Sequence, residues 1–207
     1  MSRLCCDQRE CRSRHGVDEI NGNIRTDMVC ESSFFTNTGF FEKEKAVTSN
    51  IQDSRNRTLH LLDITQHETR SLLSRLDPER IVHNDERSWR VRDIIGHLGV
   101  WNWEAVRSLR AYSQGGEYTC ISSEAKYNEY NGPAADERRT WTMEQVWAEY
   151  DAVHAQFRIL LQTMPDEKWY GEMVYPWNKR GTVQHLIEIM MTHEKRDHCS
   201  IIAKAIA

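Results

Sequence analysis

The sequence predicts an all-α protein that folds as a four-helix bundle. Four segments carry apolar residues every three or four positions, the spacing that gathers them on one face of an α-helix. Turn-forming stretches separate these segments, and no segment shows the alternation of apolar and polar residues expected of a half-buried strand. Four amphipathic helices that must each bury one face are typical of a bundle.

The first 46 residues of the 207-residue chain show neither helical nor strand periodicity. They mix both charges with Asn, Ser, Thr and Gly, so we expect a flexible N-terminal extension over 1–46 and one domain over 47–207. Four of the six cysteines lie in this extension. Their spacing lacks the C-x-x-C pair of a structural zinc site, and we expect reduced thiols.

The first two helices are predicted over residues 47–76 and 89–113. The first ends before Pro78, because a proline disfavours helical conformation in the residue that precedes it. The second reads "WRVRDIIGHLGVWNWEAVRSLRAYS" and ends at "QGGE". The short link between them predicts that the two helices run antiparallel. The turn-rich stretch 114–140 then forms a long connection between the second and third helices.

The third and fourth helices are predicted over 143–164 and from Thr182 onward. Thr142 is the expected N-cap of the third helix, and Gln145 completes a capping box with it. On a helical wheel of about 100° per residue, the apolar residues of the fourth helix form one stripe. This stripe comprises Val183, Leu186, Ile187, Met190, Ile201 and Ala205.

The segment "HEKRDH", residues 193–198, brings polar residues onto that apolar stripe. Glu194 falls near the centre of the stripe, His198 lies one turn further on, and His193 lies at the edge. A carboxylate is costly to bury unless it is paired or binds a metal. Glu194 and His198, with His97 of the second helix, therefore form a candidate metal site, and His193 is an alternate ligand. The alternative is a metal-free buried pair between Glu194 and an arginine or histidine.

Charge and hydropathy narrow the candidate partners. The net charge of −4 and the pI near 6.1 disfavour nucleic acid and anionic membranes, and no predicted helix carries a basic stripe. No run of about 18 apolar residues is present to cross a bilayer, and no secretory signal follows the first methionine. These features predict a cytoplasmic protein that acts on a small-molecule substrate, without nucleic acid or membrane as a partner.

Four stretches of the chain follow one another in a recognisable order. They read "SWRVRDIIGHLGVWNWEAV", "AKYNEYN", "TMEQVWAEYDAVHAQFRILLQTMPDEKW" and "YPWNKRGTVQHLIEIMMTHEKRDHCSII". Over residues 50–206 the sequence resembles the DinB-like four-helix bundles, including the related branch of colibactin self-resistance proteins. The resemblance implies a divalent metal held by one histidine of the second helix and an H-x-x-x-H pair of the fourth. His97 and His198 match this pattern, whereas Glu194 stands in the position of the remaining histidine.

The resemblance also implies a class of activity. Members of the family include thiol transferases and thiol-dependent isomerases that use a low-molecular-weight thiol, and the colibactin-resistance branch hydrolyses a reactive cyclopropane. We therefore expect a divalent metal (Zn, Ni, Fe or Mn) and an enzyme that acts on small electrophiles by thiol transfer or hydrolysis. The alternative is a bundle without metal that serves as a small-molecule-binding or dimerisation module. A homodimer is expected by analogy alone.

Further side chains are candidates for supporting roles. Glu104 and Asp197 could orient the histidines or move protons, the alternative for each being a solvated carboxylate. Aromatic and amide groups could line a substrate pocket at one end of the bundle, although aromatic residues at helical spacing are more often part of a core. The pocket candidates are Trp101, Tyr127, Asn128 and Trp177.

Overall fold

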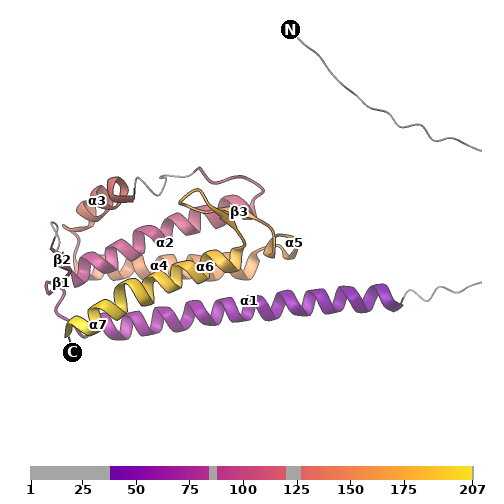
Figure 1. The fold of residues 1–207 in the computed structure, drawn as a ribbon, viewed down its shortest axis with the longest axis horizontal. Coiled ribbons are helices and arrows are strands. Elements are labelled where there is room, and N and C mark those ends of the chain that lie inside the picture. The colour runs from indigo at the N-terminus through magenta and orange to yellow at the C-terminus, as the bar shows by residue number, and fades with distance from the viewer. Residues whose placement is uncertain (1–37, 84–87, 120–126, 207) are drawn as a thin grey trace, which may run out of the picture. The chain divides into compact units, whose positions relative to one another are not determined.

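The computed structural model describes residues 38–83, 88–119 and 127–206 (Figure 1). Helix α1 spans Thr38–Leu73, so the helical part of the chain already begins within the expected N-terminal extension. The domain boundary predicted at residue 47 falls inside this helix. The remainder of the expected extension, residues 1–37, lies outside the described residues.

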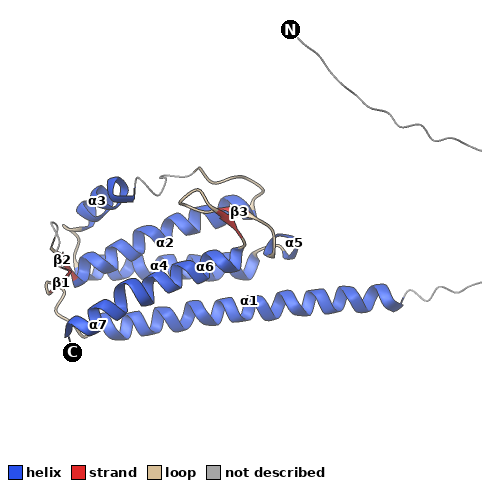
Figure 2. Cartoon of the chain, in the orientation of Figure 1, coloured by secondary structure: helices blue, strands red, loops and turns tan. Residues whose placement is uncertain are grey.

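The architecture is the predicted all-α four-helix bundle (Figures 1 and 2). Its first three helices are α1, α2 (Val91–Ser113) and α4 (Met143–Thr163). The fourth helix is continuous and consists of α6 (Val183–Thr192), the π-helical turn η2 (His193–Cys199) and α7 (Ser200–Ile206). Both α1 and α2 pack against α4 and against the fourth helix. None of the helices in the described ranges is both long and apolar enough to cross a membrane.

Short elements occupy the connections between the bundle helices. The long connection between α2 and α4 carries α3 (Tyr127–Arg138), and α5 (Asp166–Trp169) follows α4. Two antiparallel pairs of short strands precede α2 and α6: β1 (Ile81–His83) with β2 (Trp89–Arg90), and β3 (Met173–Val174) with β4 (Arg180–Gly181). The sequence predicts no strand, because two or three residues are too few to show an alternating pattern.

The apolar faces of the bundle helices meet in two core clusters. One contains Phe157, Trp169 and Tyr175, and the other contains Leu73, Val91 and Tyr150, all essentially inaccessible to solvent. Burying one large apolar side chain contributes roughly 1.5–3 kcal/mol, so these clusters account for most of what holds the helices together.

Local capping fixes where two of the helices begin. The predicted capping box of α4 is confirmed: the Gln145 amide donates to Thr142 Oγ1 (3.3 Å), and the Thr142 amide donates to Gln145 Oε1 (2.8 Å). At the start of α2, the amide of Arg90 donates to Asp93 Oδ2 (3.0 Å). These bonds satisfy amide groups that have no partner within the first turn of a helix.

The π-helical turn shifts the phase of the fourth helix. The 100° wheel places Ile201 in the core, but Ile201 is 48% exposed and Ile202 is 2% exposed. A π-helix forms i→i+5 hydrogen bonds, so its turn holds about one residue more than an α-helical turn. Every residue after η2 is therefore displaced by about one position relative to the wheel, and the prediction of Ile201 as a core residue is wrong for this reason.

The phase shift can be tested with two adjacent isoleucines. We expect Ile202→Ala to lower the free energy of unfolding by about 3 kcal/mol, because it removes buried methyl groups and leaves a cavity. Ile201→Ala is the matched control and should change this free energy by less than about 0.5 kcal/mol. Urea denaturation of both variants is the measurement. The reverse order of effects would show an uninterrupted α-helix.

Candidate functional site

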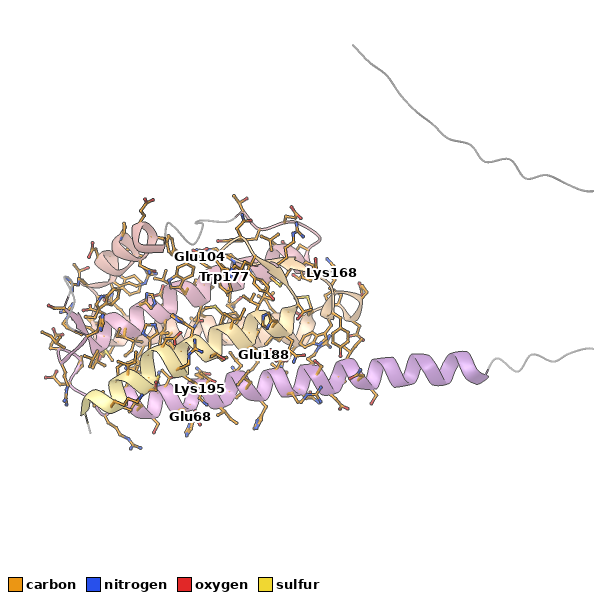
Figure 3. The ribbon with its side chains drawn as sticks, viewed as in Figure 1. Glu68, Glu104, Lys168, Trp177, Glu188 and Lys195 are labelled. Carbon is orange, nitrogen blue, oxygen red and sulfur yellow. The ribbon has the colours of Figure 1, made fainter. Side chains whose placement is uncertain are left out.

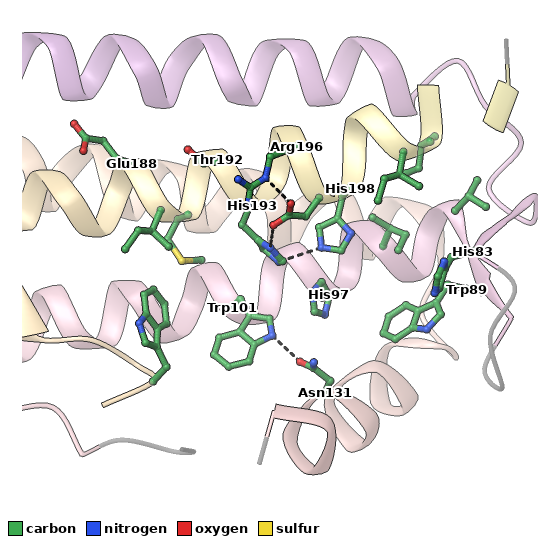
Figure 4. A pocket seen from close by; sticks show the side chains of 18 of the residues that line it. His83, Trp89, His97, Trp101, Asn131, Glu188, Thr192, His193, Arg196 and His198 are labelled. Atoms are coloured by element: carbon green, nitrogen blue, oxygen red, sulfur yellow. Dashed lines mark hydrogen bonds and ion pairs between the residues drawn. The ribbon is translucent and has the colours of Figure 1, made fainter. Parts of the chain in front are cut away.

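Three histidine side chains converge between α2 and η2. His97 comes from α2, and His193 and His198 come from η2 (Figure 4). One ring nitrogen of each lies within 4.8 Å of the other two. The Nε2 atoms of His193 and His198 are 3.0 Å apart, and the His97 ring centroid lies 4.9 Å from that of His198. We call His97, His193 and His198 the histidine cluster.

The π-helical turn is what allows His193 and His198 to share a face. In an α-helix, five residues correspond to about 500°, which would leave the two side chains about 140° apart. In a π-helix, residues i and i+5 are joined by a hydrogen bond, so they lie one above the other on successive turns. Such turns are rare and often occur at functional sites.

Burial keeps two of the three imidazoles neutral. It lowers the pKa of His97 well below the usual value, and the neighbouring imidazoles of His198 and His193 lower it further, because two protonated rings this close would repel each other. Burial, followed by the charge of His193, lowers the pKa of His198 to about 3. A neutral imidazole has a free lone pair on one nitrogen, which is the form that binds a metal ion.

Asp197 lies beside the histidine cluster and contacts one of its members. Its Oδ2 atom is 3.2 Å from Nδ1 of His193, and its Oδ1 atom accepts a hydrogen bond from Nε of Arg196 (2.8 Å). The hydrogen bond from Arg196 lowers the pKa of Asp197, with His193 contributing in the same direction, so this carboxylate is charged at neutral pH. A charged carboxylate can only accept a hydrogen bond, so Nδ1 of His193 carries the proton. Nε2 of His193, which faces the other histidines, is then left with a free lone pair.

Glu194, the carboxylate of the predicted ligand set, lies away from the histidine cluster. It is fully buried, and its Oε1 atom accepts a hydrogen bond from the Tyr150 hydroxyl of α4 (2.5 Å). Its Oε2 atom is 3.8 Å from Nε2 of His154, also on α4. The structure thus groups His193, the alternate ligand, with His97 and His198 in place of Glu194. The wheel could not predict this exchange, because it assumes α-helical geometry through residues 193–199.

The histidine cluster forms part of the wall of a pocket of about 860 Å³. Two residues predicted to line a pocket, Trp101 and Trp177, do so, and Trp89 is a third aromatic wall residue. Figure 4 labels Trp89 and Trp101. The indole Nε1 of Trp101 donates to Oδ1 of Asn131 on α3 (2.6 Å), which ties α3 to this wall. Sequence reasoning missed Asn131, although it closes the same "YNEYN" stretch that contains Asn128.

Three other predicted residues are placed differently or fall outside the description. Tyr127 and Asn128 form the first turn of α3, and their side chains are not among the described ones. Glu104, labelled in Figure 3, lies two turns after His97 on α2. It lines a separate, smaller pocket. Its carboxylate accepts hydrogen bonds from the hydroxyl of Tyr130 (2.8 Å), from that of Tyr118 and from the guanidinium of Arg107. This carboxylate therefore has partners of its own and does not orient the histidine cluster directly.

Solved structures of known proteins share this fold. An uncharacterised protein from Escherichia coli UTI89 is similar with a TM-score of 0.60 and 17% identity, over 72% of this chain and 91% of that protein. The mycothiol-dependent maleylpyruvate isomerase is similar with a TM-score of 0.58 and 13% identity, over 72% of this chain. The match spans 60% of the isomerase chain. No curated protein matches the sequence.

One of these likenesses corrects an expectation about partners. The colibactin self-resistance protein ClbS is similar with a TM-score of 0.52 and 14% identity, over 75% of this chain and 93% of ClbS, and its structure is a complex with double-stranded DNA. The exclusion of nucleic acid on the basis of net charge is therefore wrong. Net charge is a sum over the whole surface, so it does not report the charge of any one face. ClbS shows that a protein with this fold can be crystallised in complex with DNA.

Sequence comparison identifies the family directly. The family model of the DinB superfamily matches residues 61–202, which is more than half of the chain. The matched segment contains the histidine cluster, all of α2, α4 and α6, the last third of α1 and the beginning of α7. The resemblance seen in the motifs is confirmed, and the chain belongs to the DinB superfamily.

Proposed function

We propose that this protein is a divalent-metal-dependent enzyme that acts on small electrophilic molecules by thiol transfer or hydrolysis. The observation that carries the proposal is the position of the histidine cluster in the wall of a large aromatic pocket. His97 is buried and His193 and His198 are partly buried, so the three potential ligands lie at the edge of a cavity that can hold a substrate. This is the arrangement expected of an active site.

The histidine cluster fits a divalent transition metal. Three imidazole nitrogens suit Zn, Ni, Fe or Mn, and a set of three protein ligands leaves coordination positions open for water or substrate. Both His97 and His198 have lowered pKa values, so no proton has to be removed from them at neutral pH before an ion binds. A divalent ion held by these histidines would supply a nucleophile at neutral pH, because it would lower the pKa of water or of a thiol.

The surrounding residues would position and shield the reacting groups. Asp197 holds the proton of His193 on Nδ1, which keeps Nε2 directed into the site. Trp89, Trp101 and Trp177 offer flat apolar surfaces that bind the body of a small molecule and displace water from it. The mycothiol-dependent isomerase with this fold supports the proposal that a low-molecular-weight thiol is the second substrate.

A second candidate is a metal-free bundle that binds a small molecule without transforming it. The observation that favours it is the 3.0 Å contact between Nε2 of His193 and Nε2 of His198, which allows one imidazole to donate to the other. In this case the histidines partner each other, and the same pocket serves for binding alone.

Metal content separates the two candidates. We expect near-stoichiometric Zn, Ni, Fe or Mn in the purified protein, measured by elemental analysis after reconstitution. His97→Ala, His193→Ala and His198→Ala should each lose the ion, because two imidazoles hold it far less tightly than three. His67→Ala, on the exposed side of α1, is the matched control and should retain it. Wild-type protein that stays free of metal would support the binding module instead.

The metal-loaded protein should consume a small activated electrophile, such as an epoxide or an alkyl halide. Chromatography of the products with and without glutathione would distinguish a thioether from a hydrolysis product. We expect Asp197→Asn to reduce metal affinity by about tenfold or more, because it weakens the support of His193. Turnover that is the same with and without bound metal would contradict the proposed mechanism.

A further inference from the structure

We propose that Glu194 and Tyr150 are positioning residues whose hydrogen bond holds the π-helical turn in the register that brings His193 and His198 together. The proposal rests on the proposed metal site, because it assigns to this pair the task of assembling two of its three ligands. Neither residue faces the pocket, and neither contacts the histidine cluster through a hydrogen bond that the structure describes.

The sequence of the fourth helix permits two registers. In an uninterrupted α-helix, Asp197 and His198 would lie within about 60° of Glu194 and turn towards the core, while His193 would point about 140° from His198. Ile201 would then be buried in place of Ile202. Because both positions are isoleucine, the apolar packing of α7 does not by itself select one register.

Two pairs of residues show that the π register is used on both sides of the turn. His193 and His198 face α2, whereas Glu194 and Cys199, also five residues apart, face α1 and α4. Sγ of Cys199 lies 3.4 Å from Oγ1 of Thr69 on α1. Glu194 is bonded to Tyr150 on α4. An α-helical turn would direct the two members of each pair to different sides of the helix. Either the contact of Cys199 with Thr69 or the bond of Glu194 with Tyr150 would then be lost.

The Tyr150 hydroxyl is held in place by the packing of its ring, so it can favour the register that brings Glu194 within hydrogen-bonding distance. Its ring packs against Trp147 (centroids 5.4 Å apart) and His154 (4.5 Å), and the side chain is fully buried. A buried carboxyl group that loses such a donor has no water to replace it, and this makes the loss costly. Burial also raises the pKa of Glu194, and the hydrogen bond from Tyr150 opposes this shift.

The contacts on the outer side of the turn are weaker candidates for the same role. Lys195 forms an ion pair with Glu68 of α1 (2.6 Å; both labelled in Figure 3), but the two side chains are 43% and 52% exposed. Water and salt screen such pairs, so they contribute little to the choice of structure. The contact of Cys199 with Thr69 is also weaker, because sulfur is a weak hydrogen-bonding atom. The buried bond between Glu194 and Tyr150 is therefore the strongest of these contacts.

The first experiment measures the affinity of the full-length protein for Zn²⁺ and Co²⁺ by titration. We expect Tyr150→Phe and Glu194→Leu each to weaken binding by about tenfold or more, the range typical of residues that support metal ligands. Glu194→Gln keeps an oxygen that accepts from Tyr150 and should bind as the wild type does. Tyr112→Phe is the matched control, since it removes a hydroxyl that donates to the Lys168 carbonyl (3.0 Å) outside the histidine cluster. Wild-type affinity in both Tyr150→Phe and Glu194→Leu would overturn the proposal.

A second experiment reports on the register without any metal. In a Cys199→Ser background, the pair His193→Cys and His198→Cys should form a disulfide on oxidation, because the π turn stacks the two positions. In an α-helix their Cα atoms would be about 8.7 Å apart, beyond the span of a disulfide. Adding Tyr150→Phe should abolish this disulfide in glutathione buffer, whereas adding Tyr112→Phe should leave it intact.

The two experiments separate the two proposals. If the wild type binds no metal but the disulfide depends on Tyr150, the proposed function fails and the positioning role stands. If the disulfide forms equally well with Tyr150→Phe, the positioning role is overturned whatever the metal content. Tyr150→Phe removes one oxygen atom only, so it keeps the test valid even if Glu194→Leu does not fold.

Discussion

The i→i+5 hydrogen bonding of residues 193–199 is the constraint on which the site depends. It gives the fourth helix two inner faces with different tasks. One face carries His193 and His198 towards α2, and the other carries Glu194 and Cys199 into the bundle. The same turn sets the phase of α7, and through it the choice of Ile202 as a core residue. Packing, polar contacts and the histidine cluster are thus consequences of one local deviation from α-helical geometry.

Much of the fold could be predicted because its signals are local and periodic. The four helices follow from apolar spacing, and Thr142 with Gln145 marks a helix start through a short-range capping pattern. His97, His198, Trp101 and Trp177 could be selected from their positions on helix faces and in a loop, and all four line the same pocket. The exchange of Glu194 for His193 could not be predicted, since a π turn is chosen by tertiary contacts such as that with Tyr150. The two short strand pairs escape sequence reasoning because they are shorter than any detectable period.

Burial and charge have to be read at the level of individual groups. Glu194 and Glu104 are both fully buried carboxyl groups, and neither belongs to the histidine cluster. Glu194 accepts a hydrogen bond from one tyrosine hydroxyl and Glu104 from two. The buried carboxyl group of Glu194 is therefore part of a polar contact inside the core, whereas the neighbouring His193 lines the pocket. The net charge of the whole chain is equally uninformative about its partners. This chain has a net charge of −4, and a protein with the same fold has been crystallised in complex with double-stranded DNA.

The π turn also bears on how such sites can vary among related sequences. A turn that holds one extra residue is equivalent to a single-residue insertion absorbed within one turn, with ordinary helix before and after it. Histidines written four apart in one sequence and five apart in another can consequently occupy equivalent positions in space. A search that requires a fixed spacing would discard this chain. Ligand motifs on helices are better described with a variable spacing: four residues in an α-helix, and five where a π turn intervenes, as between His193 and His198.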